Sequence, residues 1–165
     1  MKKEGRKIFI VGAFALTLAL VLSLSGLAAL AQDKPSDNMQ IVRDKLKADK
    51  KLFVAENMGL TDAEAKAFWP VYDSYQKDLT KINDRTIAII KTYASNYQSM
   101  TNEAAKKLTD EFLAIQAEHQ KLRVSYLPQF RKVLSDIKVA RYYQIENKVG
   151  AVVSYELATS IPLVK

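Results

Sequence analysis

Few side chains in this 165-residue sequence could carry out catalysis or bind a metal ion. The sequence has no cysteine and one histidine, His119. The lack of cysteine excludes thiolate nucleophiles, disulfides and cysteine-ligated metals, and any Ser-His site would have to use His119. Two pairs of carboxylates lie close together in the sequence: Asp110 with Glu111, and Asp62 with Glu64. Their positions are typical of exposed helix surfaces and helix starts. We therefore expect no enzyme activity, no cofactor and no metal site.

Basic side chains are the second chemical signal, and they cluster late in the chain. Residues 121–148 carry seven basic and two acidic residues. Four aromatic residues lie among them: Tyr126, Phe130, Tyr142 and Tyr143. Such a surface would attract polypeptides over long range and hold them through weak apolar contacts. We predict a protein-binding surface formed by Arg123, Arg131, Lys132, Lys138 and Arg141; the alternative is a solvated basic face without a partner.

The first 31 residues have the three parts of a secretory signal peptide. A basic segment, Met1–Lys7, precedes an uncharged apolar run from Ile8 to about Leu30. The run closes with Ala29-Leu30-Ala31, which suits cleavage before Gln32. We expect residues 1–31 to be removed on export and residues 32–165 to form one domain. The alternative is an uncleaved membrane anchor, because about 20 apolar residues span a bilayer.

Removal of this leader would lower the net charge of the chain. The formal net charge is +7, and the leader contributes four basic residues and one acidic residue to it. From Gln32 onward 21 basic and 17 acidic residues remain, a net charge of +4. An exported protein does not meet chromosomal DNA or RNA, so we expect protein partners rather than nucleic acid. Membrane contact is expected only through the leader, if it is retained.

Residue spacing after the leader predicts an all-α fold of about four helices. The sequence contains only 5 glycines and 4 prolines, which argues against a fold rich in strands and turns. Helices are expected over 38–58, from 61 to near 99, from 101 to 133, and from 135 to about 158. Gly59 suits the left-handed position that ends a helix. The expected inner face of the first helix is Val42, Leu46, Leu52 and Phe53.

The second and third predicted helices carry heptad-spaced seams that would face each other in an antiparallel hairpin. The first seam is Phe68, Tyr72, Tyr75, Leu79, Ile82, Thr86, Ile89 and Tyr93. The second is Ala105, Leu108, Phe112, Ile115, His119, Leu122, Tyr126, Phe130 and Val133. Counting back from the turn pairs Phe68 with Phe130 and Pro70 with Pro128. A proline inside a helix removes a hydrogen bond and bends the helix. We therefore predict a bowed hairpin with kinks at Pro70 and Pro128, with a concave and a convex face.

The fourth predicted helix is apolar on more than one face. Val139, Tyr142, Ile145 and Val149 form one stripe, with Val153 and other apolar residues beside it. A helix that is apolar nearly all round needs burial on several sides. One hairpin cannot supply that burial, so we expect a wrapped monomer or, in preference, a homodimer.

Two short stretches repeat the same kind of helix start. Leu60-Thr61-Asp62-Ala63-Glu64 aligns with Leu134-Ser135-Asp136-Ile137-Lys138, and an aromatic pair follows each. The hydroxyl of Thr61 or Ser135 can cap the free amides, and Glu64 completes a capping box. A doubled Leu-Thr-x-x-Gln signature in a small exported helical protein resembles the Spy/CpxP (LTXXQ) family. The resemblance covers about residues 53–150. Glu64 and Lys138 stand where that family has Gln, and Ser135 replaces Thr.

This resemblance implies a cradle-shaped helical dimer in the periplasm. Members of the family act as ATP-independent chaperones, as dampers of envelope-stress sensor kinases or as metal-responsive proteins. The metal-responsive members tend to carry several His or Cys residues, which this chain lacks. We therefore expect an exported ATP-independent chaperone or envelope-stress adaptor that binds unfolded or envelope proteins. The alternatives are a regulatory module for the periplasmic domain of a sensor kinase and a membrane-anchored structural helical protein.

Overall fold

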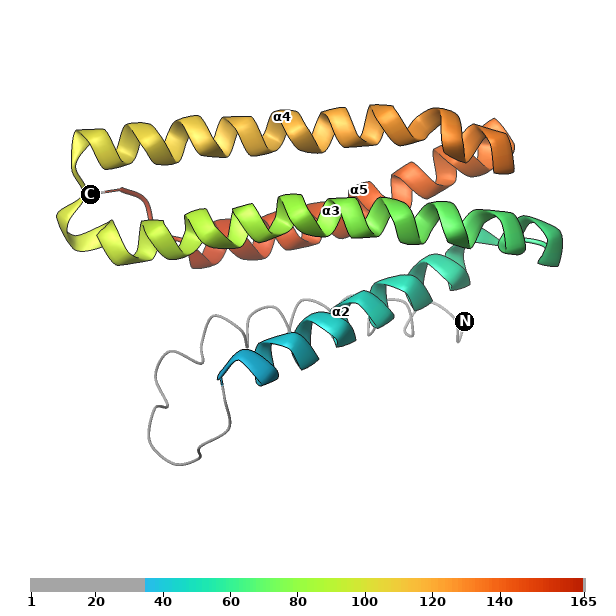
Figure 1. The fold of residues 1–165 in the computed structure, drawn as a ribbon, viewed down its shortest axis with the longest axis horizontal. Coiled ribbons are helices and arrows are strands. Elements are labelled where there is room, and N and C mark those ends of the chain that lie inside the picture. Colours follow the sequence, from blue (N-terminus) through green and yellow to red (C-terminus); the bar gives the residue numbers. More distant parts are fainter. Residues whose placement is uncertain (1–34, 165) are drawn as a thin grey trace, which may run out of the picture. The chain divides into compact units, whose positions relative to one another are not determined.

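The computed structural model describes the backbone of residues 35–164 and the side chains of residues 47–164. Over this range the fold is all-α, as the sequence predicts (Figure 1). The helices are α2 (Pro35–Met58), α3 (Asp62–Asn96), α4 (Asn102–Val133) and α5 (Asp136–Ser160), with the short 3-10 helix η2 (Tyr97–Ser99) after α3. The predicted signal peptide, residues 1–31, lies outside the described residues.

The described chain divides into two compact units. One holds residues 35–59 and 141–162, and the other holds residues 60–140 with 163 and 164. The chain therefore passes between them after Gly59, within α5 and once more after Pro162. We call them the α2 unit and the hairpin unit.

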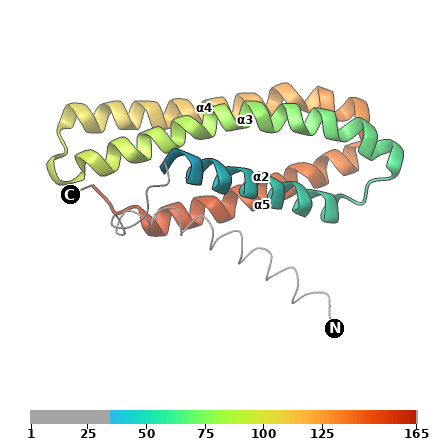
Figure 2. The ribbon, with the colours of Figure 1, turned by 60° about the horizontal axis from the view of Figure 1, so that its bottom comes forward.

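In the hairpin unit α3 and α4 run antiparallel, side by side in both views (Figures 1 and 2). The predicted seam of α3 is confirmed at its buried residues: Phe68, Tyr72, Tyr75 and Ile82. The rings of Phe68 and Phe130 lie 5.8 Å apart, which confirms the predicted pairing of these two residues. Burying each such ring contributes about 1.5–3 kcal/mol, so this aromatic end stabilises the hairpin strongly.

Tyr126 of α4 combines aromatic packing with a polar anchor. Its ring lies edge-on to Tyr75, with the centroids 5.3 Å apart. Its hydroxyl donates a hydrogen bond of 2.7 Å to Oδ2 of Asp78. Burial, then this hydrogen bond, raises the pKa of Tyr126 to about 12. The phenol therefore stays neutral at ordinary pH and joins α4 to α3.

Phe112 departs from the predicted seam, because its side chain is 48% exposed. On α4, Ile115 is buried, and Glu111 and Glu118 both pair with Arg85 of α3. These residues mark the side of α4 that faces α3. Phe112 lies about 60° round the helix from Ile115. Two helices cover only a narrow strip of each other, so Phe112 falls at the edge of the contact.

The predicted helix end at Gly59 and the predicted caps at Thr61 and Thr101 are confirmed. Gly59 has a φ of +58°, the left-handed conformation that ends a helix without a steric penalty for glycine. Thr61 Oγ1 accepts a hydrogen bond of 3.3 Å from the Glu64 amide, and Glu64 Oε2 accepts one of 2.8 Å from the Thr61 amide. Thr101 caps α4 through a bond of 3.1 Å from the Ala104 amide.

Both prolines lie inside their helices, since α3 continues through Pro70 and α4 through Pro128. A proline has no amide hydrogen, so neither residue can donate the helical hydrogen bond to the carbonyl four residues before it. Ser74 Oγ donates a hydrogen bond of 2.9 Å to the Pro70 carbonyl. The kinks and the bowed shape of the hairpin stay a prediction.

In the α2 unit, an ion pair joins α2 to α5, and both helices carry buried apolar residues. Val54, Met58, Tyr142 and Ile145 are buried. Lys50 Nζ lies 2.9 Å from Glu146 Oε2, with side chains 14% and 6% exposed. The expected inner face of this helix is wrong at Leu52, which is 58% exposed, because Val54 and Met58 occupy the buried side instead. Phe53 is half-buried. The side chains of Val42 and Leu46 lie outside the described residues.

Candidate functional site

The two repeated helix starts meet in the hairpin unit. Lys138 Nζ lies 2.5 Å from Glu64 Oε2, so the fifth residues of the two repeats form an ion pair. Ser135 repeats the role of Thr61, because its Oγ accepts a weak hydrogen bond of 3.4 Å from the Lys138 amide. The contact was absent from the sequence predictions, although aligned repeat positions of opposite charge were a signal for it.

Glu64 is the centre of this junction. Its Oε2 accepts hydrogen bonds from the Lys138 ammonium, the Thr61 amide and the Thr61 hydroxyl. The hydrogen bond from Lys138, followed by that from the Thr61 amide, lowers the pKa of Glu64 to about 2. The carboxylate is therefore ionised at every physiological pH. Leu134, the first residue of the second repeat, is buried, whereas Leu60 is half-buried.

The five basic residues predicted to bind a partner differ in their ion pairs and do not all belong to one unit. Arg131 pairs with Asp136 at 2.8 Å, and Lys138 is engaged by Glu64. Lys132 is exposed and Arg123 is half-buried, both on α4. Arg141 is exposed but belongs to the α2 unit. Whether these residues bind a protein stays a prediction.

The aromatic residues expected near the basic surface are mostly buried, as the seam predicted for Tyr126 and Phe130 requires, so the aromatic part of the predicted surface is wrong. Tyr126, Phe130 and Tyr142 are 8%, 0% and 1% exposed. They fill the cores of their units, since each lies on the buried stripe of its helix. Tyr143 is half-buried. An apolar binding surface must therefore be built from other side chains.

Exposed apolar side chains lie on α4. Among residues 62–133, the large apolar side chains that are exposed are Phe112, Leu113 and Val124, all on α4. Leu113 and Val124 are 59% and 57% exposed and lie about three helical turns apart. The exposed residues Ala117, Gln120 and Pro128 continue the same line. We call Leu113, Ala117, Gln120, Val124 and Pro128 the α4 ridge. Their spacing of three or four residues in the sequence places them on one side of a helix, and it could have predicted this ridge.

Charge is divided unequally along α4. Residues 102–118 contain four acidic and two basic residues, whereas residues 119–133 contain four basic residues and no acidic one. The two lysines of the first part form ion pairs within the helix, Lys106 with Asp110 and Lys107 with Glu103. In the second part, Lys121 and Lys132 are exposed and make no ion pair with any described residue. The ridge thus ends among accessible positive charges.

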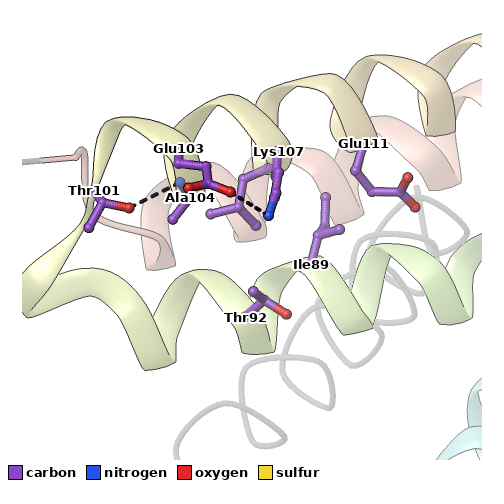
Figure 3. A pocket seen from close by; sticks show the side chains of 8 residues that line it. Ile89, Thr92, Thr101, Glu103, Ala104, Lys107 and Glu111 are labelled. Atoms are coloured by element: carbon purple, nitrogen blue, oxygen red, sulfur yellow. Dashed lines mark hydrogen bonds and ion pairs between the residues drawn. The ribbon is translucent and has the colours of Figure 1, made fainter.

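A shallow cavity of about 430 Å³ lies near the closed end of the hairpin (Figure 3). Ile89, Ala104 and Leu108 form its apolar part. Three charged residues also line the cavity: Glu103, Lys107 and Glu111. Each forms an ion pair within the protein, Glu103 with Lys107 and Glu111 with Arg85. The cavity therefore has no uncommitted charged group with which to orient a ligand.

No group of three or more His, Asp or Glu side chains that could hold a metal occurs in the described part of the chain. His119 is half-buried on α4. Burial and the nearby Arg123 lower its pKa. Among the described helices, none is both long enough and apolar enough to cross a membrane.

Comparison with known protein families, with characterised proteins and with solved structures gives no match. The resemblance to the Spy/CpxP family therefore rests on the two repeated helix starts and their setting in a helical chain.

Proposed function

We propose that this protein is an exported, ATP-independent chaperone or envelope-stress adaptor of the Spy/CpxP type, acting in the periplasm by binding rather than by catalysis. The observation that carries the proposal is the α4 ridge, in which the exposed Leu113 and Val124 lie beside a basic segment without acidic residues. Exposed apolar side chains beside positive charges that form no ion pair are the groups that an unfolded client would contact. The paired helix starts and the predicted leader support the family and the compartment.

The proposed action needs no nucleotide. Positive charge on the second part of α4 would draw unfolded chains in over long range, and the ridge would hold their apolar side chains weakly. Release follows when the client buries those side chains by folding. Weak contacts without a fixed sequence suit many clients.

Aggregation of a denatured client tests the function directly. The purified protein without its leader should suppress light scattering in the absence of ATP. Suppression should be weaker at high salt, because screening shortens the range of charge attraction to a few ångströms. A folded helical protein of similar net charge serves as the control. No suppression at a several-fold molar excess over several clients contradicts the proposal.

The compartment and the leader have a separate test. N-terminal sequencing of the protein recovered from the periplasm should begin at Gln32. A chain that keeps residues 1–31 and sediments with membranes would instead support the membrane-anchored alternative.

A further inference from the structure

We infer that the α4 ridge binds extended apolar segments that carry acidic residues beside them, through Leu113 and Val124 for the apolar part and Lys121 and Lys132 for the acids. The inference rests on the proposed function and specifies the client chemistry of its binding surface. It makes α4 the client-binding helix of the hairpin.

The shape of the ridge fits an extended chain. From Leu113 to Pro128 the helix rises about 22 Å. An extended polypeptide covers that distance in about seven residues. Leu113 and Val124 stand near the two ends, with the smaller Ala117 and the polar Gln120 between them. Two apolar client side chains separated by a few residues would therefore meet the two large ridge side chains.

The charges beside the ridge select the flanks of the client. Lys121 lies three residues before Val124, and Lys132 lies four residues after Pro128, so both are helical neighbours of the ridge. Both are exposed and make no ion pair with a described residue. No acidic residue lies between 119 and 133 to compensate them. Carboxylates of a client are the complementary groups.

The other basic residues contribute less to this selection. Arg131 already pairs with Asp136, and Lys138 is held by Glu64. An incoming carboxylate would have to compete with the protein's own acid at each of them. Lys121 and Lys132 have no such competitor among the described residues, so we expect them to account for most of the charge preference.

Fluorescence anisotropy with labelled peptides tests the preference. Two peptides share one apolar core and differ in their flanks, glutamates in one and lysines in the other. The leaderless protein should bind the glutamate peptide about tenfold more tightly, the gain that two exposed ion pairs can supply. The double variant Lys121→Glu/Lys132→Glu should reverse the preference. The control Lys47→Glu/Lys148→Glu makes the same charge change at exposed lysines of the α2 unit and should leave it unchanged.

A second pair of variants tests the apolar part. Leu113→Ser/Val124→Ser should weaken both peptides at least several-fold. Leu52→Ser/Tyr155→Ser, at side chains 58% and 68% exposed, is the matched control and should change neither. Circular dichroism should show the same helix content for every variant, because all four residues are exposed.

The outcomes separate the two proposals. If the unmodified protein suppresses no aggregation, the chaperone function fails. If it suppresses aggregation but shows no preference for the glutamate peptide, or if the control variants behave like the ridge variants, the ridge inference is wrong. If Leu113→Ser/Val124→Ser turns a dimer into a monomer in sedimentation and leaves peptide affinity unchanged, the ridge is a self-association surface and the inference is again overturned.

Discussion

Glu64 and Lys138 are 74 residues apart in the sequence, and their side chains meet at 2.5 Å. Each is the fifth residue of a repeated helix start, one at the beginning of α3 and the other at the beginning of α5. The two motifs are therefore parts of one junction within the hairpin unit. Opposite charges at the two positions suit this contact, since two like charges there would repel each other.

A charge-exchange experiment tests the junction. Glu64→Lys and Lys138→Glu should each lower the melting temperature, because each places like charges together. The double variant should recover much of the loss, although Thr61 then loses the acceptor of its capping box. Thermal melts followed by circular dichroism measure the three variants. Losses that simply add in the double variant would show that the pair is not coupled.

Acid should weaken the same junction. The pKa of Glu64 lies at about 2, below its ordinary 4.5. A lowered pKa in the folded state means that ionised Glu64 stabilises the fold above pH 4.5, and that this contribution is lost as the pH falls towards 2. The melting temperature of Glu64→Gln should lie below that of the unmodified protein at pH 7, and the gap should close by about pH 2.

Glu103→Gln is the control for the acid experiment. Its side chain is 78% exposed and, among the described residues, pairs with Lys107 on the same helix. It should melt close to the unmodified protein at every pH, since exposed pairs contribute little. A gap for Glu64→Gln that stays constant down to pH 2 would contradict the assigned role of its charge.

Two phenylalanines on α4 should respond very differently to truncation. Phe130 is fully buried, so Phe130→Ala should lower the free energy of unfolding by about 3–5 kcal/mol. Phe112 is 48% exposed, and Phe112→Ala should cost far less, within about 1 kcal/mol. Urea denaturation of the two variants gives the comparison. If both variants lower the free energy of unfolding equally, Phe112 belongs to the buried seam as predicted, and its placement at the edge of the contact is wrong.

The hydroxyl of Tyr126 should be worth one hydrogen bond. Tyr126→Phe keeps the ring against Tyr75 and removes the bond to Asp78. We expect the free energy of unfolding to fall by about 1 kcal/mol. Tyr155→Phe, at a side chain 68% exposed, is the control and should change it little. If Tyr126→Phe lowers the free energy of unfolding no more than the control does, the hydrogen bond from Tyr126 to Asp78 adds no stability beyond what a bound water supplies.

The turn at Gly59 should tolerate asparagine better than alanine. Among the described residues, a Cβ there would meet Arg141 Nη1 at the ordinary distance of 3.9 Å, so the cost comes from the backbone conformation. Gly59→Ala should destabilise the protein by about 1 kcal/mol. Gly59→Asn should cost less, because Asn visits the left-handed region more readily. Urea denaturation measures both, and the opposite order would contradict the conformational explanation.

Much of the fold could be predicted from local pattern. Thr61, Thr101 and Gly59 act at the helix ends where their side chains, or the lack of one, predict them. The aromatic spacing of α3 predicted its buried face, because a heptad repeat maps directly onto one side of a helix. The same reasoning was wrong for Phe112, since the width of a helix contact depends on how many neighbours cover it.

The candidate site was harder to predict than the fold. Tyr126, Phe130 and Tyr142 were predicted both on the apolar stripes of their helices and near the basic surface, and their burial agrees with the stripes and not with the surface. Arg131 and Lys138 were expected to meet a partner and are paired with acids of the same chain. Sequence spacing shows which residue types are near one another along a helix, but it does not show which of them the chain itself will use.

The sequence by itself determined the helical class, the helix ends and the uneven distribution of charge, because these depend on residues that lie within a few turns of each other. Tertiary structure decided that Glu64 meets Lys138, that Phe112 lies at the edge of the helix contact, and that Leu113 and Val124 stay exposed. Those outcomes depend on contacts between segments distant in the sequence. The same side chain is core or surface according to what the rest of the fold places against it.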